Sequence, residues 1–440
     1  MSSWQDICHF KRELQAGNIP YDWRLKSIPE DYKSSIPIVE SCGVLNAEEL
    51  EITNIDASIL VSKLQTGELT SVKVVTAFCK RAAVLQQLTK CCTELMFSDA
   101  IETAERLDEE FAKSGNPTGP LHGLPISLKD CCEVEGYDTC VGWAGLCFKP
   151  AEQDSVSTIA QTRRLGAVLY VKTNLPQSMM MSDSYNHVFG QSVNSLHRGL
   201  VSGGSSGGEG ALVGGRGSVI GIGTDIGGSI RIPAALQGIY GLCSSAFRVS
   251  WRRAANHQDY LINSVAGPLT WSLDSLKTYM EAYCSSNPWD IDPSIPPIPW
   301  RTELTKPPTG RKLKLGFIHD DGYVLPQPPV QRAMNHIREL FTKAGHECID
   351  WDSSSQSTSY YELWEPAILA DGGEGCKAAC KLSDPEQPLI EGMLVGKPED
   401  KLDVAQRQAL ARKILDYKQM YAQKMLESGV DAIIAPVLPW

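Results

Sequence analysis

The sequence has no apolar run long enough to cross a membrane. A transmembrane helix needs ~20 consecutive, predominantly apolar residues, and no run in this chain of 440 residues approaches that length. After Met1–Asp6 the charged residues Lys11, Arg12 and Glu13 follow within a few positions, so the long apolar stretch of a signal peptide is missing. We therefore expect a protein without a transmembrane segment, located in the cytoplasm.

Positive charge is also scarce. The chain has 41 Lys and Arg residues against 52 Asp and Glu residues, which gives a formal net charge of -11. Proteins that bind nucleic acid or anionic membranes neutralise phosphates with clustered basic residues. The acidic balance therefore argues against a nucleic-acid partner and is an expected feature of a soluble protein. The sequence leaves open whether the chain forms a homodimer.

The cysteine spacing that is typical of zinc sites is missing. The chain has 14 cysteines, but none of them forms a C-x-x-C motif, whereas zinc sites usually combine two such closely spaced ligand pairs. Two adjacent pairs occur, Cys91–Cys92 and Cys131–Cys132. We expect free thiols in a reducing compartment, with neither a metal site nor a cofactor.

Helix and strand signals alternate along the chain. Residues 1–55 are polar and interrupted by proline, which predicts an N-terminal arm, and residues 56–440 are predicted to form the main domain. Helices are predicted after caps at Asp56, Thr70 or Ser71, and Ser98, and over 330–344 and 403–427; strands are predicted over 124–128, 166–171, 218–222, 312–318 and 430–436. This alternation favours an α/β fold in which helices cover a sheet.

Residues 203–231 are rich in glycine and serine, and two nucleotide-binding interpretations of them fail. Gly203–Glu209 offers backbone amides to a phosphate, but the Lys-Ser/Thr pair of a phosphate loop is missing and Glu209 would repel the ligand. Gly221–Gly227 follows a predicted strand, but its glycine spacing is one residue too long for a dinucleotide fingerprint. The first interpretation is rejected and the second is weak.

The same stretch also indicates a serine nucleophile. Gly203–Gly207 satisfies G-x-S-x-G, a motif that needs a preceding strand and a later Asp and His. The segment 196–202 makes a poor strand, and the later histidines have no flanking signature: His257, His319, His336 and His346. A Ser-His-Asp hydrolase therefore stays possible from the residues alone.

Two serines, Ser205 and Ser229, are each embedded in glycine, 24 positions apart. Glycine lets backbone amides approach a ligand closely, and successive N–H groups over 225–229 would suit an oxyanion hole. A buried neutral lysine can act as the base for a serine, and Lys129 ends the apolar run 124–128. Desolvation there would lower the pKa of Lys129 towards the working range.

Taken together, these segments resemble the signature of the amidase signature family. The signature matches almost continuously over Gly203–Ala211 and Gly223–Pro233, and the family's lysine segment matches Gly119–Asp130. The resemblance runs from about residue 45 to the end and is closest to fungal acetamidase-like and general amidases. It implies a mixed β-sheet core covered by helices on both faces.

The resemblance also implies a catalytic triad. Ser229 would attack the amide carbonyl and become the acyl-enzyme. Ser205, after a cis peptide bond, would pass the proton between Ser229 and a neutral Lys129. The implied reaction converts a carboxylic amide to an acid plus ammonia or an amine.

Further residues receive roles through the same resemblance. Met179 would line the substrate site, and Ser205 would also contact substrate. The amides that would hold the oxyanion are those of Ile226, Gly227, Gly228 and Ser229. The residues that would support the site are Thr224, Asp225 and Arg231.

The chain departs from the family pattern in two places. Cys243, Ser244 and Ser245 stand where members usually have Arg, Pro and Ser or Thr. The chain also ends soon after the predicted strand 430–436, where members continue with more sheet and helix, so we expect a C-terminally shortened fold. A non-catalytic relative, and an acyltransferase or esterase that uses the same acyl-enzyme, are the competing hypotheses.

Overall fold

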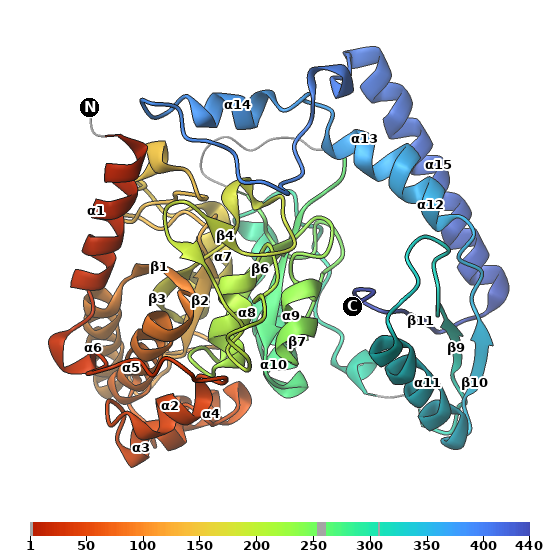
Figure 1. Cartoon of the computed structure of the whole chain (residues 1–440). Coiled ribbons are helices and arrows are strands. Elements are labelled where there is room, and N and C mark those ends of the chain that lie inside the picture. The colour runs from red at the N-terminus through yellow and green to blue at the C-terminus, as the bar shows by residue number, and fades with distance from the viewer. Residues whose placement is uncertain (1–2, 253–260, 307–308) are drawn as a thin grey trace. The chain divides into compact units, whose positions relative to one another are not determined.

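A computed structural model describes residues 3–252, 261–306 and 309–440 of the chain (Figure 1). The chain divides into two compact units. The first unit consists of Met1–Gln258, Asn263–Trp300 and Cys376–Leu394, and the second of Asp259–Ile262, Arg301–Gly375 and Val395–Trp440. The predicted division into an arm over 1–55 and a domain over 56–440 is a different partition and stays a prediction.

A six-stranded mixed sheet forms the centre of the first unit. Its strand order is β1-β3-β2-β6-β8-β7, with β3, β2 and β6 parallel and the other pairs antiparallel. The strands are β1 Cys92–Leu95, β2 Pro125–Lys129, β3 Val168–Thr173, β6 Ile220–Asp225, β7 Tyr240–Gly241 and β8 Val265–Thr270. The predicted strands at 124–128, 166–171 and 218–222 are confirmed, with small shifts at their ends.

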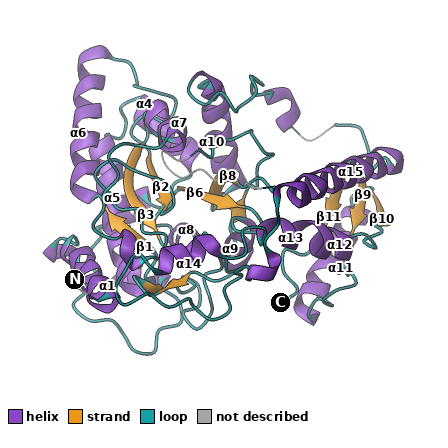
Figure 2. Ribbon diagram, turned by 90° about the horizontal axis from the view of Figure 1, so that it is seen from above, coloured by secondary structure: helices purple, strands orange, loops and turns teal. Residues whose placement is uncertain are grey.

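Helices cover both sides of this sheet. Figure 2 shows α8 and α9 on one side of β6 and β8 and α10 on the other. The helices of the first unit that follow the N-terminal region are α4 Ala57–Gln65, α5 Ser71–Thr89, α6 Phe97–Ser114, α7 Val156–Gln161, α8 Gly207–Gly214, α9 Arg231–Gln237 and α10 Leu273–Ser285. A short hairpin joins β4 Tyr185–Asn186 to β5 Gly190–Gln191. The predicted α/β fold with a mixed sheet between helices is confirmed.

The predicted helix caps are confirmed in part. Thr70 caps α5 and accepts a hydrogen bond from the Lys73 amide. Asp56 stands at the N-cap of α4, but its carboxylate accepts from the Ser275 hydroxyl instead of from the helix. The cap predicted at Ser98 is wrong, because α6 already begins at Phe97.

The N-terminal region holds a helix that the apolar pattern did not predict. The helices of this region are α1 Trp4–Gly17, α2 Ile36–Ser41 and α3 Ala47–Ile52, and α1 is the longest of them. Helix α1 begins with a capping box between Ser3 and Asp6. Its buried face carries Lys11 and Gln15 as well as Cys8. The helical period is hidden in the sequence because two of its inward-facing residues are polar.

The second unit contains a separate three-stranded parallel sheet with the order β10-β9-β11. Its strands are β9 Lys314–Phe317, β10 Glu347–Asp350 and β11 Ala432–Ile434, and its helices are α11 Pro328–Lys343, α12 Gln356–Thr358, α13 Glu365–Ile368 and α15 Val404–Ser428. Helix α14, Glu374–Cys380, begins in this unit and ends in the first. The strands predicted at 312–318 and 430–436 and the two long helices are confirmed.

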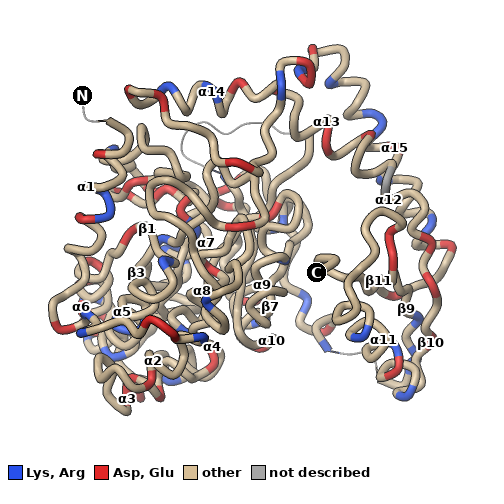
Figure 3. Tube along the Cα trace, in the orientation of Figure 1, with Lys and Arg blue, Asp and Glu red and all other residues tan. Residues whose placement is uncertain are grey.

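Charge and hydropathy show the same pattern in both units. Acidic and basic residues are interspersed along the trace rather than collected into one stretch of either sign (Figure 3). Among the helices that the structure describes, none combines the length and apolar character needed to span a bilayer.

Candidate active site

Lys129 is the last residue of β2, and strand pairing decides what lies next to it. β2 and β6 are parallel, with Leu128 opposite Ile222, so the strands end at the same edge of the sheet. This places Thr224, near the end of β6, beside the lysine, and Lys129 Nζ donates to Thr224 Oγ1 at 2.9 Å. The lysine side chain is completely buried.

Ser205 is the second partner of the lysine. Lys129 Nζ donates to Ser205 Oγ at 2.7 Å, and the peptide bond between Gly204 and Ser205 is cis. Ser205 lies just before α8 and is 2% exposed. The structure therefore brings together two of the three predicted catalytic side chains, which are 76 residues apart in the sequence.

A buried serine outside the signature holds the Ser205 turn. Ser184 Oγ donates to the carbonyl of Gly203 at 3.0 Å and accepts from the amide of Gly207 at 2.9 Å. Sequence analysis missed Ser184, since it lies in a polar loop without a motif. Only the fold reveals it, because the loop contacts the turn across 19 to 23 residues of sequence.

Ser229 lies on the loop that follows β6 and is half-buried. Its carbonyl accepts from the Ser206 amide at 3.1 Å, which joins the two glycine-serine segments directly. The Ser206 hydroxyl also accepts from the Thr224 amide at 3.3 Å. Ser229 is thus beside the residue that follows Ser205, and it is more exposed than either Ser205 or Lys129.

Asp225 organises this loop. Its carboxylate accepts from the amides of Gly228 at 2.7 Å and Ile230 at 3.0 Å, and from the guanidinium of Arg231 at 2.8 and 3.0 Å. Gly228 has a φ of +122°, which a side chain would strain. The predicted supports Thr224, Asp225 and Arg231 therefore all contact the site or its loop.

Among the four residues predicted to hold an oxyanion, the structure distinguishes Gly228. Its N–H is engaged by Asp225, so it shapes the loop. Gly227 is exposed, and Ile226 and Ser229 are half-buried. The loop thus presents backbone at the surface of the site around Ser229.

Burial sets the protonation of the groups around Ser205. Desolvation lowers the pKa of Lys129, although nearby acidic groups such as Cys131 and Asp225 oppose the effect. Burial acts to raise the pKa of Asp225, but hydrogen bonds from Arg231 and the loop amides outweigh it, and the pKa lies below its ordinary value. The lowered pKa favours a neutral Lys129, which a general base requires. The lowered pKa of Asp225 keeps this carboxylate ionised as the anchor of its loop.

Glu209 is a second buried carboxyl group, and sequence analysis considered it only as an obstacle to phosphate. It accepts from the hydroxyls of Ser127 at 2.6 Å and Thr173 at 2.8 Å. A Cβ on Gly221 would lie 2.0 Å from its Oε2, so only glycine leaves room for the carboxyl group there. Burial raises the pKa of Glu209 to about 8, against the opposing effects of Ser127, Thr173 and Lys129.

Met179 lies in a left-handed turn with φ +65° and packs, half-buried, beside Cys131 and Trp143. The neighbouring Met181 reaches the serine turn, since a Cβ on Gly204 would lie 2.5 Å from the Met181 carbonyl oxygen. The residue two positions after Met179 therefore lies against the Ser205 turn, and the substrate role of Met179 stays a prediction.

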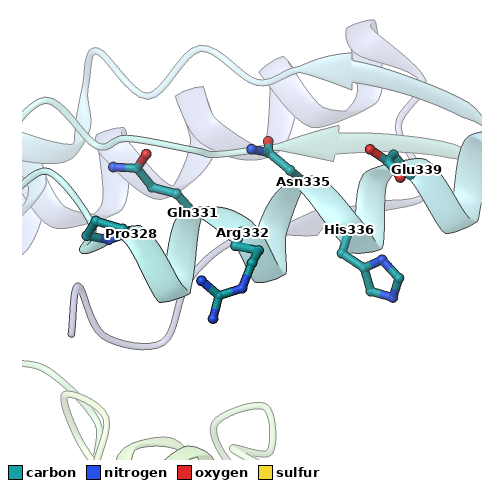
Figure 4. Close-up of a pocket in the computed structure, with 6 residues that line it drawn as sticks. All are labelled: Pro328, Gln331, Arg332, Asn335, His336 and Glu339. Atoms are coloured by element: carbon teal, nitrogen blue, oxygen red, sulfur yellow. The ribbon is translucent and has the colours of Figure 1, made fainter.

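Among the described residues, the partner of Ser205 Oγ is Lys129 rather than a histidine. His319, His336 and His346 belong to the second unit, and His257 lies outside the described residues. A hollow of about 430 Å³ runs along one side of α11 (Figure 4); it is lined by Pro328, Gln331, Arg332, Asn335, His336 and Glu339. Because side chains of a single helix line it, the hollow does not enclose a ligand, and we assign it no function.

One buried acidic cluster could in principle hold a metal ion. Glu94, Asp138 and Cys140 lie within ligand distance of one another. Lys11 already pairs with both carboxyl groups of this cluster, with its Nζ 2.5 Å from Glu94 and 2.6 Å from Asp138. The ion pairs account for the two carboxylates without a metal.

Comparisons with known proteins identify relatives of this chain. A sequence model of the Amidase family matches residues 73–440. The chain is 39% identical to an acetamidase of Emericella nidulans over 99% of this chain and 81% of that protein. It is 36% identical to an acetamidase of Aspergillus oryzae over 99% of this chain and 82% of that protein.

Solved structures show the same relationship. A fatty acid amide hydrolase superposes with a TM-score of 0.89 at 33% identity, over 98% of this chain and 77% of that one. A bacterial aryl acylamidase shares the fold with a TM-score of 0.65 at 22% identity, over 85% of this chain and 75% of that one. The chain therefore belongs to the amidase signature family and is an amide-hydrolysing enzyme.

Proposed function

We propose that this chain hydrolyses a carboxylic amide through an acyl-serine intermediate, with Ser229 as nucleophile, Ser205 as proton relay and Lys129 as base. One observation carries the proposal: a completely buried lysine donates at 2.7 Å to a buried serine hydroxyl. The loop that carries the more exposed Ser229 is hydrogen-bonded to the residue that follows this serine. A nucleophile must be accessible to substrate and must lie near the group that accepts its proton, and this arrangement fits both needs.

The reaction follows from the protonation states. Ser229 Oγ attacks the amide carbonyl carbon, and its proton passes through Ser205 to neutral Lys129. Lys129 then returns the proton through Ser205 to the leaving nitrogen, and the C–N bond breaks to leave an acyl ester on Ser229. Water, deprotonated by the same relay, attacks the ester and releases the acid.

The loop amides stabilise the negative charge that develops on the carbonyl oxygen. We assign this role to the amides of Ile226, Gly227 and Ser229. The fourth predicted amide, that of Gly228, donates to Asp225 instead and fixes the direction of the loop. Met179 and Ser205 contact the substrate beside the nucleophile.

Covalent labelling tests the assignment. Purified protein is treated with a fluorophosphonate probe, and the modified residue is identified by mass spectrometry. We expect label on Ser229, no label in Ser229→Ala, and unchanged labelling in Ser114→Ala, a matched variant at an exposed serine. Label that persists in Ser229→Ala would overturn the assignment.

Turnover tests the reaction. The relatives named acetamidases make acetamide the first substrate to test, and ammonia release gives the rate. Accumulation of a transfer product when an amine or alcohol is added would instead indicate an acyltransferase. The cytoplasmic location stays a prediction.

A further inference from the structure

A segment distant in sequence lies against the methionines beside the Ser205 turn. Residues 387–394, which we call the 387–394 segment, follow α14 in the first unit. The amide of Leu394 donates to the carbonyl of Met180 at 2.9 Å. The hydroxyl of Ser178 donates to Met393 Sδ at 3.5 Å. The two stretches thus meet along several consecutive residues.

Met181 connects this contact to the catalytic serines. Its carbonyl oxygen lies 2.5 Å from a Cβ placed on Gly204, and its Cε lies 3.4 Å from a Cβ placed on Gly392. Its backbone thus abuts the Ser205 turn, while its side chain reaches the 387–394 segment. A change in the position of the segment would therefore shift Met181, which lies next to the Ser205 turn.

Two buried glutamines hold the segment in place, each through both ends of its amide. Gln387 accepts from the Ala144 amide at 2.6 Å and donates to the Gly142 carbonyl at 3.0 Å. Gln177 accepts from the Ile390 amide at 2.9 Å and donates to the Pro388 carbonyl at 3.1 Å. Their side chains are almost completely buried, with 1% and 0% exposure.

Methionine side chains gather where the two stretches meet. Four of the ten methionines of the chain lie here: Met179, Met180, Met181 and Met393. All four are half-buried, as is Leu394. Thioether and methylene groups favour apolar ligands and adapt to their shape, but they cannot replace the hydrogen bonds that a polar group loses on leaving water.

We propose that Gln177 and Gln387 are positioning residues that hold the 387–394 segment against Met179–Met181, so that the enzyme selects amides of apolar acyl groups. The inference rests on the proposed function, since it concerns the substrate of the same site. The glutamines act through the segment and do not touch the reacting atoms.

The test uses two substrates of equal size. Hexanamide and 5-hydroxypentanamide have the same number of heavy atoms and differ only in a terminal methyl or hydroxyl group. We expect kcat/KM to favour hexanamide by about tenfold in the unaltered enzyme. In Gln177→Met and Gln387→Met this preference falls towards one, through a KM for hexanamide raised by about tenfold with a smaller change in kcat.

Gln191→Met is the matched control, because this nearby glutamine is exposed and bonds to Asp183 rather than to the segment. It keeps the preference of the unaltered enzyme. If Gln177→Met and Gln387→Met both keep the preference for hexanamide, the inference is overturned. A loss of Ser229 labelling together with all turnover overturns it too, since the glutamines would then maintain the fold instead.

Hydrogen exchange separates this inference from the proposed function. Exchange of the amides over 142–144 and 387–394 should slow when hexanamide is added to Ser229→Ala in an excess that keeps the site occupied whether or not this variant retains turnover. Slower exchange supports the inference even if Ser229 proves not to be the nucleophile. Exchange that hexanamide leaves unchanged overturns it, whatever the labelling shows.

Discussion

Helices α5 and α15 differ sharply in what surrounds them, although each is long and each is predicted from its local pattern. Fourteen of the 19 residues of α5 in the first unit are buried. The buried residues of α15, 25 residues long in the second unit, are Leu410 and Ile414. Local periodicity thus predicts a helix, whereas neighbouring elements decide how much of it is buried. In the first unit, burial also shifts the pKa values of side chains at the candidate site, such as Lys129 and Glu209.

The largest expected contrast concerns lysine chemistry. Lys129→Ala should lower kcat by on the order of 10³-fold, because it removes the base of the relay. The matched change Lys424→Ala on α15 breaks an ion pair with Asp352 at the surface and should leave kcat unchanged. Steady-state rates of amide hydrolysis measure both. Equal effects would mean that Lys129 is not the base.

The pH profile sharpens the same contrast. The proposed relay needs neutral Lys129, and burial lowers the pKa of this lysine, so kcat/KM should rise as pH increases through that lowered pKa. Between the lowered pKa and the ordinary value near 10.5, Lys129 carries its proton in the unfolded chain but not in the folded one. Stability linked to Lys129 should therefore also rise with pH in that window. An activity that falls with pH there would contradict a neutral base.

Core packing should show the next largest contrast. Leu85 of α5 is completely buried, so Leu85→Ala should lower the free energy of unfolding by about 2–5 kcal/mol. Leu415 of α15 is 67% exposed, and Leu415→Ala should change the free energy of unfolding by no more than about 0.5 kcal/mol. Urea denaturation followed by circular dichroism measures both. Similar losses would show that α15 is covered in solution.

Glu209 should link stability to pH in the opposite direction from Lys129. Its pKa is raised from 4.5 to about 8, so between these values the unfolded chain releases the proton while the folded chain keeps it. Stability linked to Glu209 is fully present below its ordinary pKa and is lost as pH rises towards 8. Relative to the unaltered protein, Glu209→Gln should gain on the order of 2 kcal/mol between pH 5 and pH 8. A pH-independent difference in thermal melting would contradict this.

The smallest effect is expected at an exposed carboxylate of the second unit. A hydrogen bond from Lys424 lowers the pKa of Asp352. The linked stability is present above the ordinary pKa and is lost as pH falls through the lowered one. Because the group is exposed, Asp352→Asn should shift the melting temperature at pH 7 by about 1 °C or less. A larger shift would show that this ion pair is shielded from solvent.

Much of the fold was predictable because its signals are local. Strands β2, β3, β6, β9 and β11 are apolar runs bounded by turn residues, and α11 and α15 show helical periodicity. Helix α1 was not predicted, because Lys11 and Gln15 occupy its buried face. Their partners, Glu94 and the carbonyl of Cys92, lie about 80 residues away, beyond the reach of any local pattern.

The candidate site divides in the same way. Ser205, Ser229 and the Asp225 loop lie within one short glycine-rich stretch, so their sequence alone marks them. Ser184, Gln177 and Gln387 carry no motif, and their importance comes from hydrogen bonds that the fold creates. A buried polar side chain gains its role from the partner that replaces water, and that partner can be anywhere in the chain.

The sequence by itself determined the family and the α/β fold, because both depend on residue type and short spacing, and through the family resemblance it supplied the proposed nucleophile, relay and base. Only the tertiary structure decided that Lys129 contacts both Ser205 and Thr224, that Glu209 is buried beneath them, and that the 387–394 segment lies against Met179–Met181. The physical reason is that the protonation of Lys129 and the contacts of the methionines depend on burial. Burial arises only when distant parts of the chain pack together.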